Sequence, residues 1–304
     1  MAADNAKSHA VGSYTAPSVA PELGKEQRRR IFRRFITNTG VVAGSVILLI
    51  IIVLSLFPGW FATHDPYLID VASRFQKPNA EHLFGTDNFG RDVWSRVVYG
   101  VKISAEVGFA VSIGASILGL IIGLYASYYR TLDHLFMRIS DGLMAFPGIL
   151  LALAIMAMLG PSIRNLVICL IAVITPHVAR VIRSTALIIR EQTYIEAMKA
   201  LGASSTRILW GHIALNSISN LIVQASFIFV EAIIVEAALS FLGAGVPLPT
   251  PSLGNMLIDG KMYIFNSWWM TAFPGAAILV LALAFNLFGD GLRDFLDPHT
   301  TARK

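Results

Sequence analysis

The ionisable residues that could carry chemistry in this sequence are few, and most stand singly within or beside apolar runs. Glu231 and Glu236 both lie in the apolar run Ser217–Phe241, where a pair of carboxyls could relay protons. Their spacing corresponds to about 140° around a helix, so the two side chains do not share a face. Small residues follow Glu236 and allow close helix packing. We therefore expect hydrogen bonding inside a helix bundle, with proton transfer as the alternative.

Other ionisable residues have simpler interpretations. Glu106 follows Lys102 by one helical turn, and Asp141 follows Arg138 by three residues, so each spacing predicts a local ion pair. We expect His177 to be a hydrogen-bonded packing residue rather than a ligand. Asp87 and Asp92 could contribute to a metal site, but no further ligand stands at a suitable spacing.

The sequence contains no catalytic constellation and no nucleotide-binding loop. A P-loop needs GxxxxGK[ST], and the two Gly-Lys pairs, at Gly24 and Gly260, are followed by Glu and Met. The single cysteine, Cys169, excludes an intramolecular disulfide and a cysteine-based zinc site. Without a catalytic constellation, we do not expect an intramembrane enzyme. We do not expect a nucleic-acid-binding protein either, because the basic residues are scattered along the flanks of apolar runs and form no single basic face. The chain is expected to bind no cofactor of its own.

The composition indicates an integral membrane protein made of helices. The chain has 304 residues, of which 55% are hydrophobic and only 14% charged, against about 25% charged in soluble domains. A helix crosses the hydrocarbon core with about 20 apolar residues. Six runs are candidates: Val41–Phe57, Ile103–Tyr125, Phe136–Leu159, Asn165–Ile189, Ser217–Phe241 and Met270–Gly289.

Basic residues predict the orientation of these spans. A cationic cluster, Lys25–Arg34, precedes the first run, and alternate loops after it are richer in Lys and Arg. We therefore expect both termini, and the stretch Glu191–His212, to lie in the cytoplasm. Residues 1–35 are expected to form a partly disordered tail, residues 36–100 the first span with an outer segment, and residues 101–304 a core of five spans.

Two outer segments have distinct patterns. Near Trp94, apolar residues recur at helical spacing, which predicts a short helix in the outer interface leading into the second span. The segment "FLGAGVPLPTPSLGNML" contains three prolines and is expected to be neither regular helix nor central strand. A stiff connector and a lid that docks an external partner are both compatible with this pattern.

The cytoplasmic stretch "TYIEAMKALGAS" predicts a short amphipathic helix that ends at Gly202. Its apolar positions recur with the spacing i, i+3, i+4 and i+7, at Tyr194, Ala197, Met198 and Leu201, whereas other faces carry Glu196, Lys199 and Ala203. Ser204 or Ser205 can cap a second helix that runs into the fifth span. So short a helix is marginal in water and needs a surface, either its own bundle or another protein.

This stretch resembles the EAA loop of ABC importer permeases, with Glu196, Ala197 and Gly202 at the signature positions, Met198 in place of the second alanine, and Leu215 in place of the usual proline. The loop spans residues 190–216. Four further blocks, "FGTDNFGRDVWSR", "RISDGLMAFPGILLALAI", "EAALSFLGAGVPLPTPSLGNML" and "FNLFGDGLRDFLDP", are similar to the C-type permease subunit of dipeptide and oligopeptide importers. The resemblance covers most of the chain.

The resemblance implies a fold, a set of partners and a mechanism. The fold would be an all-α, six-span ABC importer (type I) permease in the bacterial inner membrane. Its partners would be a second homologous permease, two cytoplasmic ABC ATPases holding ATP and Mg, an external substrate-binding protein, and membrane lipid. The residues that couple the permease to the ATPases would be Tyr194, Glu196, Ala197, Met198, Lys199, Leu201, Gly202 and Ala203. A stand-alone secondary transporter using Glu231 and Glu236 remains the competing hypothesis.

Overall fold

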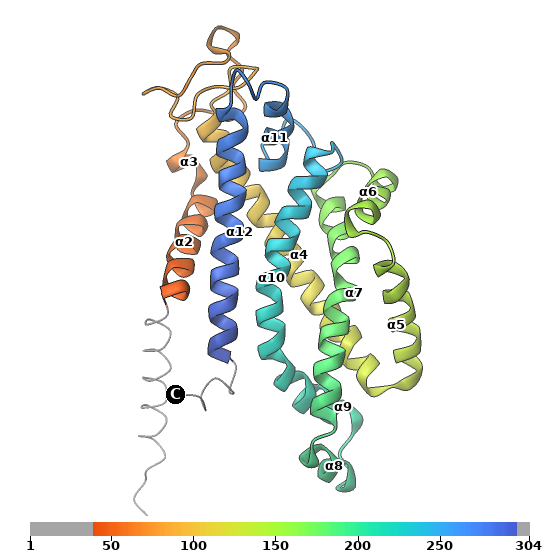
Figure 1. Cartoon of the computed structure of the whole chain (residues 1–304). Helices are drawn as coiled ribbons and strands as arrows, with labels where there is room; N and C mark the ends of the chain where they lie inside the picture. The colour runs from red at the N-terminus through yellow and green to blue at the C-terminus, as the bar shows by residue number, and fades with distance from the viewer. Residues whose placement is uncertain (1–38, 297–304) are drawn as a thin grey trace, which may run out of the picture.

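The computed structural model describes residues 39–296, and the regular secondary structure within this range is helical (Figure 1). The α-helices are α2 (Thr39–Leu56), α3 (Pro58–Phe61), α4 (Val93–Tyr128), α5 (Arg130–Met144), α6 (Gly148–Leu159), α7 (Ile163–Arg190), α8 (Thr193–Ala200), α9 (Ser205–Ile208), α10 (Leu215–Phe241), α11 (Leu253–Lys261) and α12 (Trp269–Leu296). A 3₁₀ turn, η1, covers Val71–Ser73, and a π-helical segment, η2, covers Leu209–Ala214. The predicted all-α class is therefore confirmed.

Four helical stretches in the described range are long and apolar enough to cross a membrane. They are α4, α7, the continuous path Ser205–Phe241 through α9, η2 and α10, and α12 up to Arg293. The pair α5 and α6 would add a fifth if it counts as one span. The first predicted span coincides with α2, which is apolar but shorter. The cationic cluster Lys25–Arg34, the tail 1–35 and the C-terminal basic residues lie outside the described residues.

The third predicted span, Phe136–Leu159, is wrong as a single helix. Helix α5 ends at Met144, α6 starts at Gly148, and their axes are bent by 94°. Pro147 between them explains the break, because proline donates no backbone hydrogen bond and disfavours helical backbone at the residue before it. Apolar residues continue on both sides of this proline, which is why the sequence predicted a single helix there.

Both expectations for the outer segments need correction. The helix expected in the outer interface is the first part of α4, whose 36 residues run without a break from Val93. Asp92 caps it by accepting a hydrogen bond from the Ser95 backbone N–H at 2.8 Å. The proline-rich segment is irregular only up to Ser252, which caps α11 by accepting from the Asn255 N–H at 3.2 Å.

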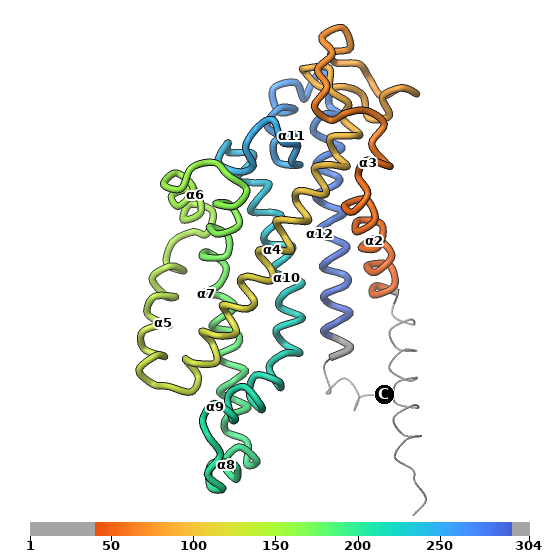
Figure 2. Tube along the Cα trace, turned by 180° about the vertical axis from the view of Figure 1, so that it is seen from behind, coloured from red at the N-terminus to blue at the C-terminus, as the bar shows by residue number. Residues whose placement is uncertain are grey.

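Helix α4 crosses the centre of the molecule and packs against α7 and α10, while α12 lies between α2 and α10 (Figures 1 and 2). Gly119 and Gly123, one turn apart on α4, allow its backbone to approach α7. A Cβ atom at Gly119 would lie 2.5 Å from Val178 Cγ1, and one at Gly123 would lie 2.7 Å from the Ala179 carbonyl oxygen. Small residues thus determine the closest contact between helices in this part of the bundle.

The connections gather at opposite ends of the bundle. The long connection between α3 and α4 lies with α11 and the start of α12 at one end, and α8 and α9 lie at the other (Figures 1 and 2). Trp269 ties α12 to the long connection by donating its indole N–H to the Thr86 carbonyl at 3.1 Å. We refer to the end that contains the long connection and α11 as the outer end, following the predicted orientation.

The polar residues within the helices follow the sequence predictions only in part. Lys102 and Glu106 form the predicted ion pair at 3.9 Å. Asp141 does not pair with Arg138; it contacts Arg180 on α7 at 2.5 Å, because α5 lies along α7. His177 is exposed on α7 rather than packed in the core, so that prediction is wrong.

Candidate functional site at the connection between α7 and α10

Helix α8 is short, and both its sequence and its contacts with the bundle favour its formation. Glu196 stands in its first turn and Lys199 in its last, which is the charge order that the helix dipole favours. The predicted stop is confirmed, because α8 ends at Ala200 and Gly202 follows with a φ of +79°. An eight-residue helix cannot persist alone in water, so its contacts decide whether it forms.

A Schellman motif closes α8. The Gly202 N–H donates to the Lys199 carbonyl at 3.0 Å, and the Ala203 N–H donates to the Met198 carbonyl at 3.0 Å. No neighbouring atom lies within 4 Å of a Cβ built on Gly202. Glycine is therefore required here by the left-handed backbone and not by a lack of space.

One face of α8 is anchored in the bundle. Ile195 is fully buried in the main hydrophobic cluster, and Met198 and Ala203 pack against the same cluster while partly buried. Two hydrogen bonds fix the adjoining chain to the end of α4: Tyr128 donates to Ser205 Oγ at 3.1 Å, and the Arg190 guanidinium donates to a backbone carbonyl at 2.5 Å. The segment is thus held against the end of α4 and against the main hydrophobic cluster of the bundle.

The opposite face of α8 is exposed. Leu201 at its tip is 88% exposed and Tyr194 is 38% exposed, with Glu196, Ala197 and Lys199 also at the surface. The sequence prediction assigned Met198 to the same face as Tyr194 and Leu201, whereas Met198 turns partly toward the bundle. Two apolar stripes overlap on this helix, and the one through Ile195 was missed.

After the turn that follows α8, the chain runs from α9 through η2 into α10 as one helical path. Ser204 caps α9 by accepting from the Arg207 N–H at 3.4 Å, as the sequence predicted. The path from Ser205 to Phe241 includes the π-helical segment η2, which the sequence did not predict. Asn216 near the start of α10 donates to the Tyr194 hydroxyl at 3.2 Å, so α8 and α10 also touch through side chains.

The two carboxyls of α10 differ in their surroundings. Glu236 is fully buried and accepts hydrogen bonds from Ser104 on α4 at 2.9 Å and from Ser240 at 2.8 Å. The predicted hydrogen bonding in the bundle interior is therefore confirmed for Glu236. Glu231 is exposed, and its carboxylate has no ion pair or side-chain hydrogen bond among the described residues.

A buried ion cluster holds the outer end together. Asp87 accepts from the Arg91 guanidinium at 2.6 Å and lies 3.7 Å from that of Arg96, and Arg91 also reaches Asp259 on α11 at 3.1 Å. Both arginines and Asp87 are buried. Burial raises the pKa of the Asp259 carboxyl above its ordinary value, although the arginines oppose that shift. The sequence analysis did not identify this cluster, because its members come from the long connection, α4 and α11.

Comparison with known proteins gives two family matches. Residues 115–302 match a family described as the binding-protein-dependent transport system inner membrane component. Residues 26–78 match the N-terminal transmembrane domain of oligopeptide transport permease C.

Individual proteins are similar over most of their length. A Brucella abortus protein named as a permease of a peptide transport system is 45% identical, covering 91% of this chain and 94% of that protein. A dipeptide transport system permease of Alkalihalophilus pseudofirmus is 43% identical, covering 89% of each chain. A glutathione transport system permease of Escherichia coli is 40% identical, covering 93% of this chain and 94% of the other.

Proposed function

The chain belongs to the family of binding-protein-dependent transport system inner membrane components, the permease subunits of ABC importers, and from this we propose how it couples to its partners. It is a multi-pass membrane protein, and proteins similar to it over most of their length are named as peptide, dipeptide or glutathione transport permeases. The proposal is that it forms half of a pathway for dipeptides, oligopeptides or a related small solute such as glutathione, and that α8 docks on an ATPase.

The proposed assembly contains four kinds of partner. A second homologous permease completes the pathway, two cytoplasmic ATPases bind ATP and Mg, an external binding protein delivers the solute, and lipid surrounds the bundle. The proposal assigns nucleotide binding to the ATPases and not to this chain, because its sequence has no P-loop. We further propose six spans with both termini in the cytoplasm, α2 serving as the first span and the bent pair α5–α6 as the third.

The observation that carries the coupling role is the two-sided construction of α8. Its inner face is fixed by Ile195 and the contacts around it, while Leu201 at its tip is almost entirely exposed. Leu201 and Tyr194 thus leave apolar surface on a helix that is too short to persist alone in water, and a partner that covers this surface would stabilise it. The neighbouring Glu196 and Lys199 would add charge complementarity at the edge of the contact.

The mechanism follows from the attachment of α8 to the bundle. A force applied to α8 by closure of the ATPases would pass through Ile195 into the core, and along the path Ser205–Phe241 into α10. The helices would then move as rigid bodies between outward-open and inward-open states. ATP and the loaded binding protein must each bind one state more tightly than the other to drive the cycle.

Reconstituted uptake tests this proposal. The test uses proteoliposomes that contain both permeases and both ATPases, with the ATPase side facing the lumen. They are expected to accumulate labelled peptide only when ATP is in the lumen and the binding protein is outside. This chain alone, with a proton or sodium gradient, is expected to accumulate none. Gradient-driven uptake by the isolated chain would instead establish the competing secondary transporter.

A matched pair of substitutions separates the two hypotheses further. The double variant Glu231→Gln with Glu236→Gln removes both titratable groups, while the amide at 236 still hydrogen bonds to the serines. We expect ATP-driven uptake to stay within about threefold of the unmodified protein, since no more than one hydrogen bond of roughly 0.5–1.5 kcal/mol is weakened. A proton-coupled carrier would lose its driving reaction, so a loss of uptake with intact assembly would contradict our account.

A further inference from the structure

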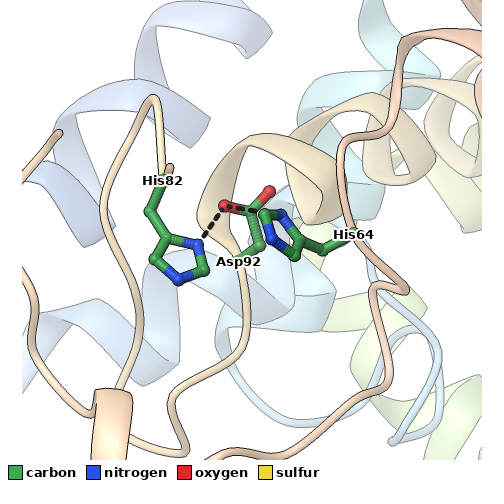
Figure 3. Close-up of side chains that lie close together, drawn as sticks. All are labelled: His64, His82 and Asp92. Atoms are coloured by element: carbon green, nitrogen blue, oxygen red, sulfur yellow. Dashed lines mark hydrogen bonds and ion pairs between the residues drawn. The ribbon is translucent and has the colours of Figure 1, made fainter. Parts of the chain in front are cut away.

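Two histidines and a buried aspartate meet at the outer end, from three separate segments (Figure 3). His64 follows α3, His82 lies in the long connection to α4, and Asp92 immediately precedes α4. The Nδ1 atoms of His82 and His64 lie 3.0 Å and 4.0 Å from Asp92 Oδ1. One ligand atom from each of the three side chains can be chosen so that all lie within 4.8 Å of one another.

The charge around Asp92 is unusual for a buried carboxylate. Asp92 is 2% exposed, and its ion-pair partners among the described residues are only the two histidines. The nearby Arg91 is engaged with Asp87 and Asp259, and Arg96 lies by Asp87. A buried carboxylate normally has a permanent cation or a metal ion beside it. Here two imidazole rings face it, and imidazole is the commonest protein ligand of metal ions.

The three side chains are oriented by further hydrogen bonds. Asp92 Oδ2 accepts from the Ser95 N–H at 2.8 Å and from the Thr63 hydroxyl at 3.2 Å, which leaves Oδ1 directed at the histidines. The His64 backbone N–H donates to Ser95 Oγ at 3.0 Å. The His82 backbone is held by Asn79, whose Oδ1 accepts at 2.7 Å. Such outer contacts are what fixes ligands in metal sites.

We propose that His64, His82 and Asp92 bind a divalent transition-metal ion, through two imidazole nitrogens and one carboxylate oxygen. This donor set suits zinc and its neighbours rather than magnesium or calcium, which prefer oxygen ligands. Ligand atoms around a tetrahedral zinc ion lie about 3.3 Å apart, between the two distances that Asp92 Oδ1 makes with the histidines. A fourth position is left for water or for a group of an external partner.

The ion would fasten the outer connection to the bundle. It would join the segment after α3 and the loop around His82 to the first turn of α4, three segments otherwise linked by a few hydrogen bonds. The site is independent of α8, which lies at the opposite end of the molecule (Figure 1). Failure of this inference would therefore leave the proposed coupling role untouched.

Zinc binding to the intact transporter complex tests the proposal. The complex, purified without a polyhistidine tag and stripped with chelator, is titrated with Zn²⁺ against a chromophoric chelator. We expect the unmodified complex to bind one additional Zn²⁺ ion tightly. In complexes that carry His64→Gln, His82→Gln or Asp92→Asn, we expect the affinity of this site for Zn²⁺ to fall at least about tenfold. Asparagine at 92 still caps α4, so that variant removes the ligand charge without removing the cap.

Exposed histidines provide the matched controls. His134→Gln on α5 and His177→Gln on α7 are expected to leave the zinc content unchanged. X-ray absorption of the zinc-loaded unmodified complex is expected to show two imidazole ligands at the ion that the three variants lose. Equal zinc binding by the unmodified complex and all three variants would overturn the proposal. So would a spectrum without imidazole, which does not depend on whether any variant folds.

Discussion

Replacing Gly202 with proline is expected to lower ATP-driven uptake by about 100-fold or more. Proline fixes φ near −65° and has no N–H, whereas Gly202 has a φ of +79° and donates to the Lys199 carbonyl. If proline here costs as much as it does inside a helix, about 3 kcal/mol, the equilibrium constant for forming the turn after α8 falls by about 100-fold, and a helix as marginal as α8 has little stability to offset this loss. The measurement is peptide uptake by proteoliposomes, with ATPase retention in the purified complex measured alongside.

Two alanine variants provide the controls. Gly202→Ala retains the N–H but strains the left-handed backbone by about 1–2 kcal/mol, so we expect an intermediate loss of uptake. Gly211→Ala, in η2, meets no atom within 4 Å and has no positive φ, so uptake should be unchanged. Full uptake by the Gly202→Pro variant would contradict the coupling role of this segment.

Removing the carboxylate of Asp87 is expected to destabilise the outer end severely. Asp87→Ala leaves Arg91 without its closest partner and Arg96 without its only anion within 4 Å among the described residues. Breaking one partner of a buried ion pair costs about 3–5 kcal/mol. We therefore expect a large drop in the thermal unfolding temperature of the detergent-solubilised complex, and poor accumulation of the chain in cells.

The exposed ion pair of α5 and α7 serves as the matched control. Asp141→Ala removes a carboxylate that is itself paired with an arginine, but the side chains of Asp141 and Arg180 are 63% and 48% exposed. Exposed pairs contribute about 0–1 kcal/mol, so the unfolding temperature should change little. If the Asp87 and Asp141 variants unfolded alike, the buried cluster would not hold the outer end as we infer.

Local patterns in the sequence predicted most of the long helices and the end of α8, but not the contacts between distant segments. The helix around Tyr194 and its stop at Gly202 depend on a few neighbouring residues, and both are confirmed. The role of Ile195 depends on which of two overlapping apolar stripes meets the bundle, which only packing decides. The break at Pro147 was visible in the sequence, but the surrounding apolar run was interpreted as continuous.

Polar residues show the same division. Lys102 and Glu106 are neighbours on one helix, and their spacing predicts the pair. Asp141 has Arg138 three residues before it, but it pairs with Arg180 because α5 packs along α7. The sequence does not reveal this packing. His64, His82 and Asp92 come together only because the long connection folds back onto the start of α4, so no motif spacing indicates them.

The account depends most on the claim that the exposed face of α8 binds an ATPase. A photo-reactive benzoyl-phenylalanine placed at position 201 of the intact complex in cells tests this directly, because Leu201 is 88% exposed and an apolar replacement should not disturb the fold. The control places it at position 262, where Met262 is 81% exposed near α11 at the outer end. Our account predicts a covalent adduct with the ATPase from position 201 and none from position 262. No adduct from position 201 in a complex that still transports peptide would contradict it.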